Sequence, residues 1–115
     1  MKILIGGDIS VRASQELFAN KKTKELFNDV LNVTKQADEF IVNLECAVTD
    51  KDTKIKKFGP NLKAPYGTCE VLKEAGVTLC AISNNHIFDY GKAGIKDTFE
   101  QLDKNGLPYT GFGEN

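Results

Sequence analysis

Short apolar segments alternate with amphipathic ones along this chain, and the alternation predicts an α/β fold. Four runs are apolar, rich in β-branched or aromatic residues, and too short for a helix. These predicted strands are Ile3 to Gly6, Phe40 to Leu44, Val77 to Ile82 and Tyr109 to Gly111. Predicted helices are Thr23 to Ala37, Thr68 to Ala75, and Gly91 to Gly106. Because strands and helices alternate, the sheet is expected to be mainly parallel with flanking helices.

The sequence indicates which residues of each predicted helix face the core and where two of the helices end. In the first, helical spacing puts Leu26, Val30 and Val33 on an inner face, with Phe27 and Leu31 beside them. The second is expected to begin with Thr68 as its N-cap and to end at Gly76. In the third, Ile95, Phe99 and Leu102 mark the inner face, and Gly106 with Pro108 marks the end.

The turns and loops are also marked in the sequence. Gly6-Gly7 is expected to let the chain turn sharply after the first strand. The stretch from Asp50 to Ala64 is polar and lysine-rich and contains Gly59-Pro60, so a loop with little regular structure is expected. One domain over residues 1–115 is predicted, truncated because Gly111 to Asn115 is a loop without a terminating element.

The composition and the lengths of the apolar runs argue against several functional classes. With 15 Lys and Arg against 16 Asp and Glu, the formal net charge is −1, which argues against a dedicated nucleic-acid binder. No apolar run approaches the ~20 residues of a membrane span, and the first run is too short for a signal peptide, so a cytoplasmic location is expected. Cys46, Cys69 and Cys80 are odd in number and lack Cys-x-x-Cys spacing, so free buried thiols are expected.

Oxygen-bearing side chains follow three of the predicted strands: Asp8, Glu45 and Asn85. Parallel strands bring their carboxyl ends to one edge, where open α/β sheets bind ligands, so these three are expected to converge. Two carboxylates ~4 Å apart repel by roughly 4 kcal/mol at an effective dielectric of 20, and either protonation of one acid or a bound cation would offset this repulsion. Oxygen donors favour Mn²⁺, Mg²⁺ or Fe over Zn²⁺. Each residue alone also has an ordinary interpretation as a turn, cap or solvated residue.

His86, the only histidine, follows Asn85. Beside a cation, its imidazole would act as general acid toward a leaving group or stabilise an oxyanion; the alternative is a structural histidine that caps the strand. Asp89 either orients His86 or caps the helix near Gly91, and the cap is favoured.

The remaining candidates are predicted either to contact the substrate or to support the metal ligands: Ser10, Arg12, Asn43 and Asn84. Arg12 is either a clamp for an anion or a surface residue. Four lysines are interpreted as a solvated face, and the alternative is that they steer an anionic substrate: Lys54, Lys56, Lys57 and Lys63. Cys46 is expected to point away from Glu45 into the core.

Several of these residues form motifs that resemble a known family. The motifs are Gly7-Asp8, Asn43-Leu44-Glu45, Asn84-Asn85-His86-Ile87-Phe88-Asp89-Tyr90-Gly91, Gly94, Asp97-Thr98 and Gly111-Phe112-Gly113-Glu114-Asn115. They resemble the bacterial capsule-synthesis proteins of the CapA type, associated with poly-γ-glutamate capsules, within the calcineurin-like metallophosphoesterase superfamily. The resemblance covers nearly the whole chain and implies the N-terminal half of an αββα sandwich.

The resemblance also implies functional roles. Asp8, Glu45 and Asn85 would be metal ligands, His86 would assist the leaving group, and the substrate would be anionic or related to the cell envelope. Two departures matter: Asp8-Ile9-Ser10 lacks the usual histidine of Asp-x-His, and Asn43-Leu44-Glu45 replaces Gly-Asp-x-x-Asp. Later histidines of a two-metal centre would lie beyond Asn115, so the fragment alone is expected to be inactive.

Three alternatives stay open. The first is a non-catalytic role in capsule assembly, in which the site binds substrate without turnover. The second is a serine acyl-hydrolase that uses Ser10 with His86 as base. The third is a homodimer or domain swap that covers a sheet edge left exposed by truncation.

Overall fold

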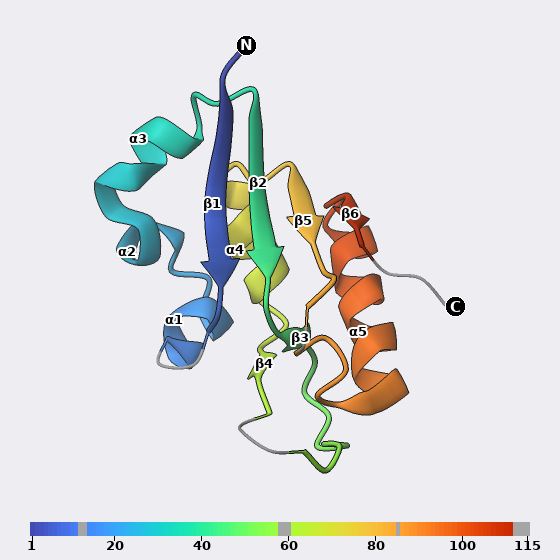
Figure 1. The fold of residues 1–115 in the computed structure, drawn as a ribbon. Coiled ribbons are helices and arrows are strands. Elements are labelled where there is room, and N and C mark those ends of the chain that lie inside the picture. The colour runs from blue at the N-terminus through green and yellow to red at the C-terminus, as the bar shows by residue number, and fades with distance from the viewer. Residues whose placement is uncertain (12–13, 58–60, 85, 112–115) are drawn as a thin grey trace.

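The computed structural model describes residues 1–11, 14–57, 61–84 and 86–111. A four-stranded parallel sheet, in the order β1-β2-β5-β6, forms its centre (Figure 1). The strands are β1 (Ile3–Ile9), β2 (Glu39–Leu44), β5 (Leu79–Ala81) and β6 (Tyr109–Thr110). The predicted fold class, a mainly parallel sheet with flanking helices, is confirmed, and it is consistent with part of a metallophosphatase-like sandwich.

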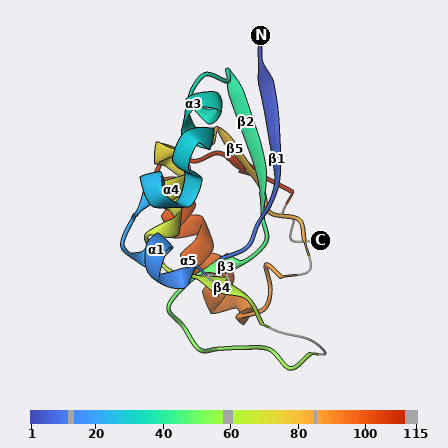
Figure 2. The same cartoon turned by 90° about the vertical axis from the view of Figure 1, so that its left-hand side faces the viewer.

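The helices lie on one side of the sheet (Figure 2). They are α1 (Gln15–Ala19), α2 (Thr23–Phe27), η1 (Asn28–Val30), α3 (Leu31–Thr34), α4 (Thr68–Glu74) and α5 (Gly91–Lys104). Their inner faces and the sheet enclose a core that includes Val42, Leu44, Leu72, Ile82 and Leu102. In α5, Ile95 and Leu102 are buried and Phe99 packs against the core, as the spacing predicts.

The predicted helix from Thr23 to Ala37 is wrong as a single element. Asn28 has a positive φ (φ 48°, ψ −132°), which is outside the helical regions, and its amide Nδ2 donates to the carbonyl oxygen of Glu25 (3.2 Å). A positive φ is uncommon outside glycine, and asparagine is among the residue types in which it is enriched. The segment is therefore divided into α2, η1 and α3, and Val30 and Val33, expected on the inner face, are exposed.

Three short elements were not predicted: α1 and the two-stranded parallel sheet of β3 (Ala47–Val48) and β4 (Lys63–Ala64). Both strands are too short to show a period of two in the sequence. The rest of the predicted loop from Asp50 to Ala64 has no helix or strand among its described residues. The β3–β4 pair matters because it anchors both ends of that loop beside the sheet.

The outer face of the sheet carries exposed apolar side chains at β1. Ile3 and Ile5 are exposed, whereas Leu4 between them packs against the core. This alternation follows from the period of two in a strand. Among the described residues, no helix combines the length and apolar character that crossing a membrane requires.

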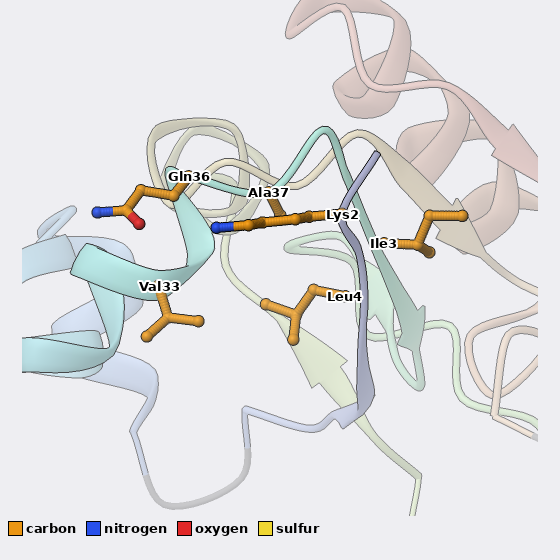
Figure 3. Close-up of a pocket in the computed structure, with 6 residues that line it drawn as sticks. All are labelled: Lys2, Ile3, Leu4, Val33, Gln36 and Ala37. Carbon is orange, nitrogen blue, oxygen red and sulfur yellow. The ribbon is translucent and has the colours of Figure 1, made fainter.

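A hollow of about 190 Å³ lies between α3 and the amino end of β1 (Figure 3). Its lining residues are Lys2, Ile3, Leu4, Val33, Gln36 and Ala37. This end of the sheet is opposite to the strand ends that carry the predicted site. One lysine is the only titratable side chain in the lining, so the hollow is not a candidate catalytic site.

The N-terminus of α4 differs from the prediction. Gly67 is the N-cap, and Thr68, predicted for that role, is the first helical residue. A Cβ at Gly67 would lie 2.4 Å from the carbonyl oxygen of Phe18, so the close approach of α1 requires glycine there. The hydroxyl of Thr68 is buried and has no hydrogen-bond partner among the described residues.

Replacing Thr68 with valine is therefore expected to raise the free energy of unfolding by about 1 kcal/mol, because it removes an unpaired buried hydroxyl and keeps the side-chain shape. Thr98 provides a matched control. Its hydroxyl accepts the Val48 N–H (2.9 Å) and donates to the Gly94 carbonyl (2.7 Å), so Thr98→Val should lower the free energy by about 1–3 kcal/mol. Urea unfolding measures both, and a loss of stability in Thr68→Val would contradict the prediction.

Candidate functional site

A bulge in β1 sets the position of Asp8. Ile5 pairs with Ile41 and Asp8 pairs with Asn43, so β1 uses one residue more than β2 over this stretch. Gly7 has a positive φ of 75°, which suits the bulge. The prediction that the chain turns sharply at Gly6-Gly7 after the first strand is therefore wrong. The strand continues through the two glycines to Ile9 and bulges between Ile5 and Asp8. Asp8 lies within β1 and is exposed at the carboxyl edge of the sheet.

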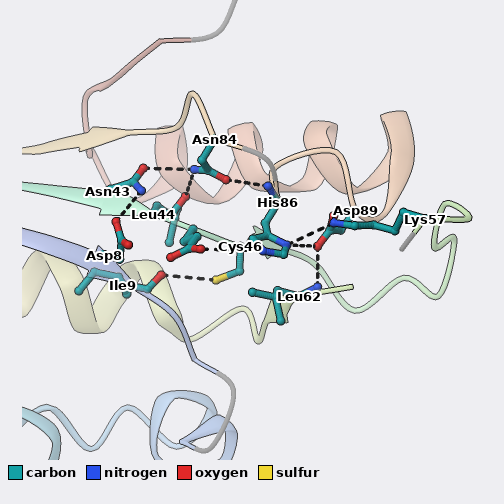
Figure 4. Close-up of polar contacts among 11 residues, drawn as sticks. Asp8, Ile9, Asn43, Leu44, Cys46, Lys57, Leu62, Asn84, His86 and Asp89 are labelled. Carbon is teal, nitrogen blue, oxygen red and sulfur yellow. Dashed lines mark hydrogen bonds and ion pairs between the residues drawn. The ribbon is translucent and has the colours of Figure 1, made fainter. Parts of the chain in front are cut away.

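Two amide side chains connect Asp8 to the segment after β5 (Figure 4). Asn43 Nδ2 donates to Asp8 Oδ1 (2.8 Å), and Asn84 Nδ2 donates to Asn43 Oδ1 (3.2 Å) and to the Leu44 carbonyl (2.8 Å). Asn84 Oδ1 then accepts the backbone N–H of His86 (3.0 Å). The two asparagines, predicted to support the site, thus fix the chain that carries His86 relative to β1 and β2.

The imidazole of His86 lies between two carboxylates. The residue is 9% exposed. Its Nδ1 is 2.6 Å from Asp89 Oδ2, and its Nε2 is 3.8 Å from Glu45 Oε1. Because an ionised carboxylate only accepts, Nδ1 carries a proton and donates it to Asp89. Nε2 is then the ring nitrogen that can bind a ligand or exchange a proton.

Asp89 is the most enclosed charged residue of the site, with 0% of its surface exposed. Burial raises the pKa of its carboxyl, but hydrogen bonds from Lys57 (2.6 Å), the Leu62 N–H (2.7 Å) and His86 outweigh burial and hold the pKa below its ordinary value. The preferred prediction for Asp89, a helix cap, is wrong: Tyr90 is the N-cap of α5, and no side chain caps that helix. The contact that the alternative requires, between Asp89 Oδ2 and His86 Nδ1, is present (2.6 Å), and the orienting role of Asp89 stays a prediction.

Lys57 corrects the interpretation of the lysines as a solvated face. Its Nζ forms the ion pair with Asp89, and its side chain is only 19% exposed. Lys63 is also engaged, with Nζ 2.9 Å from Asp52 Oδ1 and 5.2 Å from the centre of the Tyr90 ring. Lys54 and Lys56 are exposed, as expected. The sequence alone does not show which of the four lysines reaches Asp89, because this depends on how the loop from Asp50 to Ala64 packs against the rest of the chain.

The other predicted residues are placed as follows. Ser10 is exposed, and no hydrogen bond among the described residues joins it to His86. Glu45 is half-buried and faces His86 Nε2. Cys46 beside it is in the core, as predicted, and burial raises the pKa of its thiol to about 12. Arg12 and Asn85 lie outside the described residues.

All three cysteines are free and buried, as expected. Burial raises the pKa of the Cys69 thiol to about 12 and that of Cys80 to about 11. Thiols with such values carry almost no thiolate, the reactive form of cysteine, near neutral pH.

The chemistry of the candidate donors fits a divalent cation. Asp8 and Glu45 offer carboxylate oxygens, and His86 has its Nδ1 held by a carboxylate, as histidines that bind metals through the other nitrogen usually do. Within the described part of the chain, no three His, Cys, Asp or Glu side chains are grouped closely enough to hold a metal ion. The ligand set of Asp8, Glu45 and Asn85 therefore stays a prediction.

Comparison with known proteins places the chain in a family. Residues 2–115 match the family described as bacterial capsule synthesis protein PGA_cap. The chain is 36% identical over 113 residues to the capsule biosynthesis protein CapA of Bacillus anthracis, covering 95% of this chain and 28% of that protein. It is 30% identical over 109 residues to the PGA biosynthesis protein CapA of Bacillus subtilis (strain 168), covering 93% and 29%.

A further relative, the uncharacterized protein y4sH of Sinorhizobium fredii, is 29% identical over 98 residues, covering 77% of this chain and 20% of that protein. The chain thus spans less than a third of the length of the curated relatives it matches. The match to the family covers the strands, the two asparagines and the His86–Asp89 pair described above. On this match and these identities, the chain belongs to the bacterial capsule synthesis protein family PGA_cap.

Proposed function

We propose that this chain supplies part of a metal-dependent, phosphoesterase-like hydrolase site in a CapA-like capsule biosynthesis protein. The observation that carries the proposal is the His86 imidazole, which Asp89 holds at Nδ1 and which faces Glu45 with Nε2. A histidine that only capped a strand would need one partner. Here the ring has a buried anion behind it and a second carboxylate in front, at the sheet edge where Asp8 lies.

The proposed ligands of the divalent ion are Asp8, Glu45 and Asn85. Their oxygen donors favour Mn²⁺, Mg²⁺ or Fe over Zn²⁺. When bound, such an ion lowers the pKa of a bound water and stabilises negative charge on the group under attack. Asn43 holds Asp8 by a hydrogen bond to one oxygen, and no side chain among the described residues donates to the other carboxylate oxygen.

His86 is the proposed general acid. Since Nδ1 keeps its proton in the bond to Asp89, Nε2 is the atom that gains a proton and passes it to the leaving group. Two carboxylates, those of Asp89 and Glu45, lie beside the two ring nitrogens. The substrate is proposed to be an anionic, cell-envelope-related molecule connected with poly-γ-glutamate, because a relative is named for PGA biosynthesis.

Calorimetric titration of the complete protein with Mn²⁺ tests the metal proposal. We expect the protein to bind Mn²⁺, and we expect Asp8→Asn and Glu45→Gln each to lower the affinity by roughly 10-fold or more. A loss of roughly 10-fold is already typical when a residue that only hydrogen-bonds to a metal ligand is replaced. Asp52→Asn is the control, since Asp52 is exposed and pairs only with Lys63 among the described residues. Unchanged affinity in both ligand variants would overturn the assignment.

A second candidate is a binding site without turnover. It is favoured by the finding that no metal-binding group of three His, Cys, Asp or Glu side chains occurs within the described residues. Binding of a γ-linked glutamate oligomer by the complete protein, without Mn²⁺ binding and without change to the oligomer, would support this candidate over the hydrolase.

A further inference from the structure

Lys57 reaches the site on a loop that is bonded to the start of α5. On one side of Lys57, the backbone N–H of Ile55 donates to the Asp89 carbonyl oxygen (2.9 Å). On the other side, Asn61 Nδ2 donates to the same Asp89 oxygen (2.8 Å) and to the Ile55 carbonyl oxygen (3.1 Å). The loop is therefore attached both before and after Lys57, and these bonds deliver its ammonium group to a defined place.

The two oxygens of the Asp89 carboxylate have separate partners. Oδ1 accepts from Lys57 Nζ (2.6 Å), while Oδ2 accepts from His86 Nδ1 (2.6 Å) and the Leu62 N–H (2.7 Å). Three donors on a fully buried carboxylate fix its rotation as well as its charge. Lys57 is the only one of the three that brings a fixed positive charge.

The separate partners of the two Asp89 oxygens determine which ring nitrogen of His86 carries the proton. A buried carboxylate that loses its cation tends to take up a proton, because burial disfavours its charged form. A protonated Asp89 could donate to Nδ1, and the proton of the neutral ring would then move to Nε2. With Lys57 in place, Asp89 stays an acceptor and Nδ1 stays the donor.

We propose that Lys57 is a positioning residue, which keeps Asp89 as a charged acceptor and thereby fixes the orientation and tautomer of His86. Its importance for hydrolysis rests on the proposed function of His86. The charged groups that face the ring among the described residues are Asp89 at Nδ1, Glu45 at Nε2 and Lys57, whose Nζ lies 3.5 Å from Nδ1.

Nitrogen-15 and proton NMR of the imidazole tests this directly, because the chain has one histidine. In the wild type we expect one ring state, protonated at Nδ1, with a downfield proton resonance protected from exchange. Lys57→Met should lose that resonance, and Lys57→Arg should keep it because the positive charge and its donors remain. Lys56→Met is the matched control, since Lys56 is an exposed neighbour and its replacement should change nothing.

The amide spectrum shows whether each variant is folded. If Lys57→Met does not fold, Lys57→Gln takes its place, because it keeps a neutral donor and removes the charge, and the same loss is expected. The proposal is overturned if the folded uncharged variant keeps the protected Nδ1 proton, or if Lys57→Arg loses it.

Kinetics of the complete protein provide a second readout. Lys57→Met should lower kcat on the order of 10- to 100-fold, as changes to groups that orient a histidine usually do, with KM little changed and activity restored by Lys57→Arg. If the complete protein hydrolyses no phosphoester, the proposed function fails, while the imidazole spectrum still decides the role of Lys57.

Discussion

Replacing Asp89 with alanine is expected to lower the free energy of unfolding by about 3–5 kcal/mol, as is typical when one partner of a buried ion pair is removed. The carboxylate is fully buried and accepts from Lys57, His86 and the Leu62 N–H. Its removal leaves an ammonium and a backbone N–H without their acceptor. It also removes the ion pair between Lys57 and residue 89, although the hydrogen bonds to the residue 89 carbonyl oxygen remain.

Urea unfolding of the 115-residue chain measures this loss, and Asp52→Ala is the control. Asp52 also pairs with a lysine, Lys63, but it is exposed, so its removal should have no measurable effect. A similar small effect for Asp89→Ala would show that its buried contacts contribute little, and would contradict the prediction.

The loss of unfolding free energy in Asp89→Ala should become smaller as the pH is lowered. The pKa of folded Asp89 is held below its ordinary value, whereas the unfolded carboxyl titrates at about 3.9. Its stabilising contribution is therefore fully present above about pH 5 and disappears as the pH falls through the folded pKa. The stability difference between wild type and Asp89→Ala should narrow below about pH 4. A difference that widens in acid would contradict this sign.

The fold could be predicted from the sequence because its strands are apolar runs and its longest helix is strongly periodic. Ile95, Phe99 and Leu102 face the core of α5 as their spacing indicates. The helix before β2 could not be predicted in detail, since the backbone of Asn28 leaves the helical conformation with a positive φ, and the apolar spacing does not reveal this interruption. In that segment Val30 and Val33 are exposed, although their spacing is helical.

The candidate site was predictable to the extent that it depends on parallel strands. The register of β1 with β2 brings Asp8 beside Asn43, and the end of β5 brings Asn84 to the same edge. The part that depends on a loop was not predictable. Lys57 lies among several lysines in a polar stretch, and only tertiary hydrogen bonds from Ile55 and Asn61 select it. Asp89 was misassigned for the same reason, because its cation comes from 32 residues earlier in the chain.

The largest expected effect on activity is that of His86→Asn, which should lower kcat of the complete protein by about 10²–10⁴-fold, the range for losing a general acid. Asparagine removes the proton that Nε2 would pass to the leaving group. Mn²⁺ binding should be kept if the ion depends on Asp8, Glu45 and Asn85. Loss of Mn²⁺ binding in His86→Asn would instead make His86 a metal ligand.

The leaving group separates acid catalysis from a structural role of His86. An alkyl phosphate expels a strongly basic alkoxide, which needs the proton, whereas a nitrophenyl phosphate expels a stable phenolate, which does not. A general acid should therefore matter much less for the nitrophenyl ester, and the loss in His86→Asn should shrink there by roughly 10-fold or more. Glu45→Gln is the matched comparison, because a lost ligand should slow both esters alike. Equal losses for the two esters in His86→Asn would contradict the assignment of His86 as the acid, and would reduce its role to holding the end of β5 against Glu45 and Asp89.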